Sequence, residues 1–183
     1  MSTTTLPTGV TTGTWTIEAS HSSASFTVRH AGISKTRGTV AITEGAITIG
    51  EDLASSSVTA TLDPATVDTR DANRDGHLKS ADFFEVEKFP TWTFVSTSIE
   101  ARGDDYVLVG DLTIHGVTRQ VELEVEFNGA ATDPFGNARL GFSASTEFSR
   151  KDFGLTWNAA LETGGVLVSD KVKVSLEIEA IKA

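Results

Sequence analysis

The sequence predicts an all-β protein, a closed antiparallel barrel of eight strands with one short helical excursion near residues 71–84. Apolar and polar residues alternate with period two in most segments between residues 15 and 179, as expected for strands with one buried and one solvated face. The strands are also long, and long antiparallel strands expose unpaired edges unless the sheet closes on itself.

The first two predicted strands lie near the N-terminus. Trp15, Ile17 and Ala19 form one alternating series, and a second series runs from Ala24 to His30. Residues 1–13 are rich in Ser, Thr and Gly and lack the apolar content that would offset the entropy of ordering them. We therefore expect a mobile N-terminal tail over residues 1–13 and a single β-barrel domain over residues 14–183.

The pattern continues through the rest of the chain. Further predicted strands lie at residues 38–49, 57–62, 91–97, 106–114, 121–127, 138–148 and 172–178. Turn residues such as Asn128-Gly129 separate them. The segment from about Asp71 to Phe84 breaks the alternation and places Leu78 and Ala81 at a spacing typical of a helix.

The composition fits one domain and disfavours several classes of partner. The chain has 183 residues, with 15 Lys and Arg against 25 Asp and Glu, a net charge of −10 that disfavours nucleic acid and anionic membrane surfaces as partners. Because cysteine is absent, disulfides and thiolate metal sites are excluded. The first residues resemble no signal peptide and no stretch could span a bilayer, so we expect a cytoplasmic protein without stable membrane insertion.

Residues 71–82 match part of a calcium-loop template. Asp71, Asn73 and Asp75 take its first, third and fifth positions, Gly76 follows, and Asp82 takes the twelfth. Against this, a lysine occupies the ninth position, and the preceding residues have the pattern of a strand where the template needs a helix. We predict no metal site, and a calcium-binding variant of this segment stays as an alternative.

No arrangement of residues typical of catalysis is visible. The chain has no GxSxG nucleophile elbow and no glycine-rich phosphate loop. Its four histidines, His21, His30, His77 and His115, are not at the spacing of a helical metal motif. We predict a protein that is not an enzyme, has no catalytic residue and uses no cofactor. The alternative is a lipid-modifying enzyme with His30 or His77 as the base.

Four ordered motifs carry a resemblance to a known family. They are TWTIEASHSSASFTVRHAGIS at 14–34, VDTRDANRDGHLKSADFFEVEKFPTWTF at 67–94, GDLTIHGVTRQV at 110–121 and FSRKDFGLTWN at 148–158. Together they resemble the YceI family of polyisoprenoid-binding proteins with a lipocalin-like barrel. Glu18 stands where the family usually has Asp, and Gln120 where it commonly has Pro.

The resemblance implies a protein that binds, sequesters or carries an isoprenoid lipid, such as a polyprenyl phosphate or an isoprenoid quinone, and it is compatible with a homodimer. A filled barrel with a stress-related interaction role is the other alternative. Strand parity suggests apolar contacts to the lipid from Trp15, Phe26, Val28, Phe94, Leu108, Leu112 and Phe142. Candidate polar contacts at the mouth are His30, Arg74, His77, Lys79 and Arg150, since Arg suits a phosphate and a neutral His can donate to a carbonyl.

Overall fold

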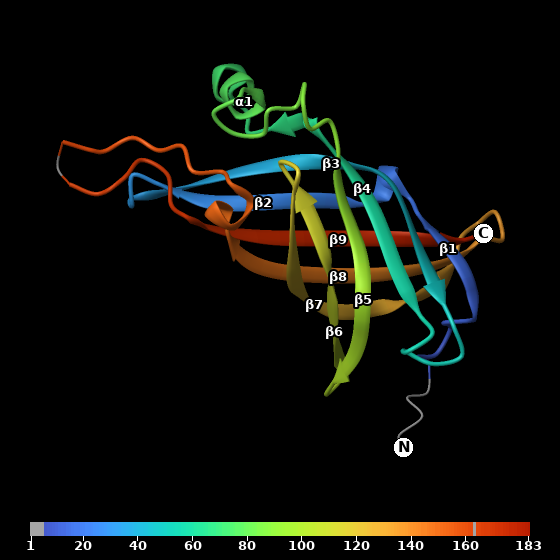
Figure 1. The fold of residues 1–183 in the computed structure, drawn as a ribbon. Helices are drawn as coiled ribbons and strands as arrows, with labels where there is room; N and C mark the ends of the chain where they lie inside the picture. The colour runs from blue at the N-terminus through green and yellow to red at the C-terminus, as the bar shows by residue number, and fades with distance from the viewer. Residues whose placement is uncertain (1–5, 163) are drawn as a thin grey trace.

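The computed structural model describes residues 6–162 and 164–183 and shows a barrel of antiparallel strands with one α-helix beside one end (Figure 1). The strands are β1 (Gly13–Ile17), β2 (Ser23–His30), β3 (Ser34–Ile49), β4 (Ser57–Asp68), β5 (Trp92–Arg102), β6 (Asp105–Ile114), β7 (Val117–Thr132), β8 (Ala138–Ser149) and β9 (Lys171–Lys182). The helices are the 3₁₀ turns η1 (Ala19–His21) and η2 (Arg150–Phe153) and the α-helix α1 (Ala72–Lys79).

Nine strands occupy eight positions around the barrel. β1 and β2 both pair with β3 on one side and with β9 on the other, so they follow one another in the same position and are separated by η1. The remaining strands pair in sequence order from β3 to β9, and the β3–β4 and β2–β9 pairings close the ring. This confirms the prediction of a closed eight-stranded antiparallel barrel.

β4 extends further than its sequence predicts. It continues through the buried Pro64 to Asp68, although proline cannot donate a ladder hydrogen bond. The register between β3 and β4 shifts in this region, and the Ala41 N–H donates to Thr66 Oγ1 at 2.8 Å. The Thr66 hydroxyl therefore accepts a hydrogen bond that a backbone carbonyl would otherwise accept, and β4 continues past Pro64.

The predicted helical excursion is confirmed as α1 and the turn that follows it. The Asp71 side chain caps the helix by accepting from the backbone N–H groups of Asn73 and Arg74, each at 3.0 Å. Beyond the helix, Phe83 and Phe84 are both 7% exposed and pack into the barrel core. These two phenylalanines fix α1 over the end of the barrel.

The buried residues form two clusters. The larger includes Phe83, Phe84 and Phe153 and lies toward α1, and the smaller surrounds Trp15 and Leu140 at the opposite end. Residues 1–5 of the expected N-terminal tail lie outside the described residues. Residues 6–12 lie against the end opposite α1, where Val10 packs on the smaller cluster.

Candidate functional site

The barrel interior holds a cavity of about 660 Å³. This volume lies within the range of roughly 300–1,000 Å³ that is typical of small-molecule sites. The cavity runs from Pro7, Val10 and Leu53 at one end to Trp157 and Leu167 at the other. We call the end bounded by α1, the β2–β3 turn and residues 154–162 and 164–170 the mouth, because His30 and Arg74 line the cavity there and are also exposed to solvent.

The inward faces of the strands make the cavity wall almost entirely apolar. Six of the seven predicted apolar contacts line it, namely Phe26, Val28, Phe94, Leu108, Leu112 and Phe142. They come from β2, β5, β6 and β8, on different sides of the ring. A thin hydrocarbon inside the cavity would therefore meet apolar side chains on all sides.

Trp15 does not line the cavity, contrary to the expectation from strand parity. Its side chain is fully buried in the smaller cluster with Leu140 and Ala180. The indole N–H donates to the Thr11 carbonyl oxygen at 3.0 Å, and Lys182 Nζ lies 5.4 Å from the ring centroid. Strand parity predicts which face of the strand a residue occupies but not how closely its neighbours pack around it. Trp15 is enclosed within its cluster, although its neighbours Ile17 and Ile47 line the cavity.

Four of the five predicted polar contacts lie at the mouth, namely His30, Arg74, His77 and Arg150. The exception is Lys79, which lies on the far side of α1 beside a small surface depression that it shares with Gly76 and Val86. The last turn of α1 directs this lysine away from the cavity. Lys79 is therefore corrected from a mouth residue to a surface residue.

Arg150 lines the mouth but has little capacity left for a ligand. Its Nε donates to the Ser169 carbonyl oxygen at 3.0 Å, and its Nη1 donates to that of Leu155 at 2.6 Å. Burial lowers the pKa of the guanidinium, and the nearby Asp170 carboxylate partly opposes this shift. Because the residue is only 4% exposed, we interpret Arg150 as the brace that fixes the segment after β8 across the mouth.

Two of the three guanidinium nitrogens of Arg74 hydrogen-bond to Thr69, the residue that follows β4. Its Nε donates to Thr69 Oγ1 at 2.8 Å, and its Nη2 donates to the Thr69 carbonyl oxygen at 2.6 Å. Asp75 accepts from the backbone N–H and the hydroxyl of the same threonine. Thr69 therefore anchors α1 to the barrel, and Arg74 presents its third nitrogen, Nη1, at the mouth.

The two mouth histidines differ in how firmly they are held. His77 Nε2 lies 2.8 Å from Asp82 Oδ2, and its ring packs edge-on against Phe83 and Trp157. The His30 imidazole makes no hydrogen bond within the part of the chain that the structure describes, and its backbone bridges Val168. His30 is thus a mouth side chain whose two ring nitrogens are available to a ligand.

These contacts also argue against a calcium site at residues 71–82. Residues 72–79 form a helix rather than a loop that wraps a cation. The side chain of Asp71 caps that helix, Asp75 is bonded to Thr69, and Asp82 is bonded to His77. The carboxylates of the template are each directed to a different protein partner.

Three residues missed by strand parity also line the mouth, namely Thr69, Leu155 and Trp157. Leu155 and Trp157 lie in the irregular segment after η2, where alternation gives no prediction. A signal was nevertheless present, since both residues belong to the motif FSRKDFGLTWN. This segment and α1 together form the cover of the barrel end (Figure 1).

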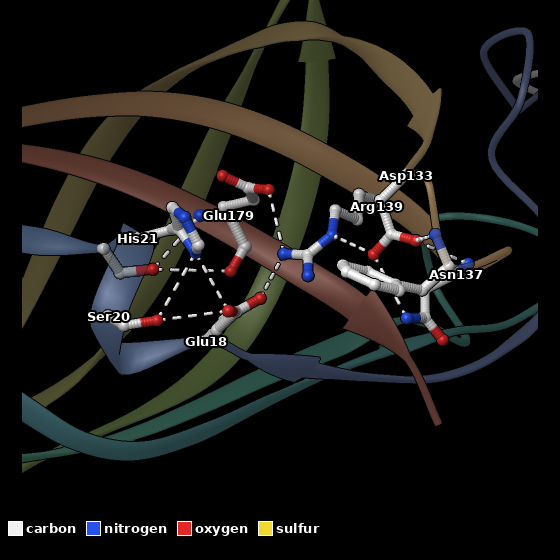
Figure 2. Close-up of polar contacts among 9 residues, drawn as sticks. Glu18, Ser20, His21, Asp133, Asn137, Arg139 and Glu179 are labelled. Atoms are coloured by element: carbon white, nitrogen blue, oxygen red, sulfur yellow. Dashed lines mark hydrogen bonds and ion pairs between the residues drawn. The ribbon is translucent and has the colours of Figure 1, made fainter.

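A second polar cluster lies outside the cavity, where β1, β8 and β9 meet (Figure 2). Arg139 donates to Glu18, to Glu179 Oε1 at 3.0 Å and to Asp133 Oδ2 at 2.8 Å. Arg139 holds the pKa of the Asp133 carboxyl well below its usual range, and a hydrogen bond from His21 lowers the pKa of Glu18. The cluster clamps the break between β1 and β2 to the strands beside it.

Within residues 6–162 and 164–183, the group with a donor set suited to a metal ion is Glu18, His21 and Glu179, whose ligand atoms lie within 4.8 Å of one another. The Arg139 guanidinium already bonds to both carboxylates. Because the positive charge of Arg139 neutralises Glu18 and Glu179, we interpret the three residues as part of the clamp and not as a metal site. In the same described residues, no helix is both long and apolar enough to cross a bilayer.

Comparisons with known proteins agree with this architecture. The YceI-like domain model matches residues 15–180. A UPF0312 protein of Staphylococcus aureus (strain MSSA476) is 36% identical over 171 residues, which cover 90% of this chain and 95% of that protein. Protein YceI of Escherichia coli (strain UMN026) is 41% identical over 139 residues, covering 75% of this chain and 73% of that protein.

Solved structures show the same fold at lower sequence identity. BcnA of Burkholderia cenocepacia superposes with a TM-score of 0.75 at 21% identity, covering 89% of this chain and 98% of that chain. A polyisoprenoid binding domain from Saccharophagus degradans, implicated in plant cell wall breakdown, gives a TM-score of 0.68 at 15% identity, with 92% and 98% covered. The match of the family model over most of the chain, together with these relatives, shows that the chain belongs to the YceI-like domain family.

Proposed function

We propose that this protein binds the hydrocarbon chain of an isoprenoid lipid inside the barrel and carries it without chemical change. The observation that supports this most directly is the apolar cavity of about 660 Å³ along the barrel axis. A domain of the same fold from Saccharophagus degradans is described as binding polyisoprenoids. The narrow, enclosed shape of an eight-stranded barrel suits one slender ligand.

The energetics of binding depend on whether the lipid enters the barrel from water or from a membrane. Burial of each methylene from water contributes about 0.8 kcal/mol, so ten buried carbons supply about 8 kcal/mol, enough for micromolar affinity. Most of this gain vanishes when the chain leaves one apolar medium for another. Selectivity among lipids must then come from the fit of the chain and from polar contacts to its head group.

The mouth favours a head group with hydrogen-bond acceptors. Among the residues that the structure describes, Arg74 Nη1 and the His30 imidazole are donors at the mouth that make no hydrogen bond to the protein, and Arg29 also borders the cavity. Phosphate oxygens or quinone carbonyls both match these donors. We infer that His30 and Arg74 select the head group, while Arg150 and His77 shape the opening.

Extraction tests the proposal directly. The purified protein is extracted with organic solvent and examined by mass spectrometry, and the delipidated protein is then incubated with a polyprenyl phosphate and with an isoprenoid quinone. We expect a prenyl lipid in the extract or saturable uptake of one of the two. Repeated absence of any prenyl lipid, with no uptake of either, would refute carriage.

Variants at the mouth separate a binder from an enzyme. His30→Ala should shift the preference between phosphate and quinone head groups while uptake of the chain persists, because the apolar wall is unchanged. His77→Phe keeps the aromatic contacts of the ring and tests its polar role separately. Conversion of the lipid to a product by the wild-type protein, abolished in either variant, would contradict the proposal of a carrier.

A further inference from the structure

Positive charge gathers on one outer wall of the barrel, near the mouth. Arg29 on β2 pairs in register with Lys35 on β3, and Thr27 lies between Arg37 on β3 and Lys173 on β9. Lys35, Arg37 and Lys173 alternate with residues that line the cavity, so their side chains are on the outer face, and Arg29 lies at the rim, where it also borders the cavity. They form a basic wall on a chain whose net charge is −10.

The protein's own acids neutralise this wall only in part, since Glu147 faces Lys173 across the β8–β9 pair, and a hydrogen bond from Lys171 together with the charges of Lys171 and Lys173 lowers the pKa of that carboxyl. Arg29, Lys35, Arg37 and Lys173 form no ion pair within the described part of the chain. The acids that adjoin these strands are Asp68, opposite Thr39 in the β3–β4 pair, Glu147, opposite Lys173 in the β8–β9 pair, and Asp170, directly before β9. Two of these are already engaged by other lysines, since Lys171 Nζ lies 2.8 Å from Glu147 and Lys151 Nζ lies 3.4 Å from Asp170.

Negative charge gathers on the opposite wall. β7 is four positions from β3 in either direction around the eight-membered ring. Its outward side chains Glu122, Glu124 and Glu126 are all exposed. The barrel is therefore electrically polarised across its width, and an anionic surface would attract one wall and repel the other.

Two exposed apolar side chains project beside the mouth at the end of the basic wall. Ile33, in the β2–β3 turn, is 87% exposed, and Val166, in the segment before β9, is 50% exposed. The two segments are joined, because the Ala31 N–H donates to the Leu167 carbonyl oxygen at 2.8 Å and His30 bridges Val168. Both extend beyond the barrel on the same side, at the left of Figure 1.

We propose that this end of the molecule docks on the surface of an anionic phospholipid bilayer. Ile33 and Val166 enter the interface, and the basic wall contacts the lipid phosphates. His30, which lies between these two segments and the cavity, then faces the bilayer, so that a prenyl chain enters the barrel without crossing water. The route of the chain rests on the proposed function, whereas the docking itself does not.

Flotation with vesicles tests docking in the absence of any isoprenoid. We expect the protein to float with vesicles of phosphatidylcholine mixed with phosphatidylglycerol, to float poorly with phosphatidylcholine alone, and to be released by high salt. Lys35→Glu/Arg37→Glu should weaken the partition at least about 20-fold, since each basic residue near the surface contributes about fivefold. Ile33→Asp should weaken it about tenfold.

Phe135 provides the matched control. It is 88% exposed in the β7–β8 turn, at the end of the barrel opposite the mouth (Figure 1). Phe135→Asp removes an equally exposed apolar side chain and adds the same charge, so it should float like the wild type. Equal flotation with both vesicle types, or equal loss in Phe135→Asp and Ile33→Asp, would overturn the docking proposal.

The two proposals fail in different ways. Unfolding midpoints in urea first establish that each variant retains the wild-type stability. Flotation without uptake of any prenyl lipid would refute carriage and support docking. Uptake of a prenyl lipid from detergent micelles, together with no flotation, would refute docking and support carriage.

Discussion

The hollow interior predicts an unusual result for an enlarged side chain. Ala144 on β8 lines the cavity and is only partly buried. Its neighbours in register are Val125 on β7 and Leu176 on β9, which also line the cavity. In Ala144→Phe the phenyl ring points into the open centre, where about 660 Å³ is available.

The expected stability change follows from the room around the ring. Burial of a phenyl side chain contributes about 1.5–3 kcal/mol, and fixing its rotamer costs about 0.5–1 kcal/mol. The net gain is therefore about 1 kcal/mol. With a urea m-value of about 2 kcal/mol/M, the unfolding midpoint should rise by about 0.5 M. Uptake of a long prenyl chain should fall, because the ring occupies part of its path.

Ala180→Phe is the control that makes this result decisive. Ala180 has no exposed surface and packs in the smaller cluster with Trp15 and Leu140. Overpacking a filled region costs about 1–3 kcal/mol, so this variant should unfold at lower urea. If Ala144→Phe is destabilised as much as Ala180→Phe, the barrel centre is filled and the reasoning from the cavity is wrong.

Three further predictions concern the framework of the barrel. Arg150→Met leaves the carbonyl groups of Leu155 and Ser169 without their donor and should lower the free energy of unfolding by about 3 kcal/mol; an unchanged urea midpoint would contradict the bracing role. Gly110→Ala places a Cβ 2.4 Å from Phe94 Cζ and 2.7 Å from the Val95 carbonyl oxygen; it should cost about 2 kcal/mol in the same assay, and a neutral result would show that the backbone yields. The folded-state pKa of Asp133 is lowered, chiefly by Arg139, and that of Glu18 chiefly by His21. Such groups stabilise the fold above their unfolded pKa of about 4, and this stability is lost as the pH falls toward their folded pKa. The urea concentration at the unfolding midpoint should therefore decrease when the pH is lowered below about 4. If the midpoint of Glu18→Gln/Asp133→Asn changes with pH in parallel with that of the wild type, the clamp is refuted.

Period-two alternation was sufficient to predict the barrel and most of its wall. It depends only on the opposite directions of successive side chains, which every strand shares. Phe26, Phe94 and Leu112 therefore face the cavity as expected. Alternation carries no information about how tightly the surrounding side chains pack, and for this reason Trp15 was expected in the cavity wall and is instead enclosed within the smaller cluster.

The polar contacts were harder to predict because they depend on partners that are distant in the sequence. Arg139 meets Glu18 across 121 residues, through the adjacent positions of β8, β9 and β1. The role of Arg150 depends on the path of the segment up to Ser169, which returns across the mouth. The sequence identified Arg150 as a polar residue near the mouth, but not the carbonyl groups that engage its guanidinium.

The two buried clusters explain how the barrel tolerates its cavity. A closed ring of strands satisfies the backbone hydrogen bonds without help from the interior, and the clusters around Phe153 and Trp15 bury large side chains at either end. The centre still lacks dispersion contacts that a filled core would make. A prenyl chain in the cavity would supply these contacts only in the folded state, so occupancy and folding stability are thermodynamically linked. On this argument, the proposed affinity for a prenyl chain would come from the contacts that the chain makes with the cavity wall.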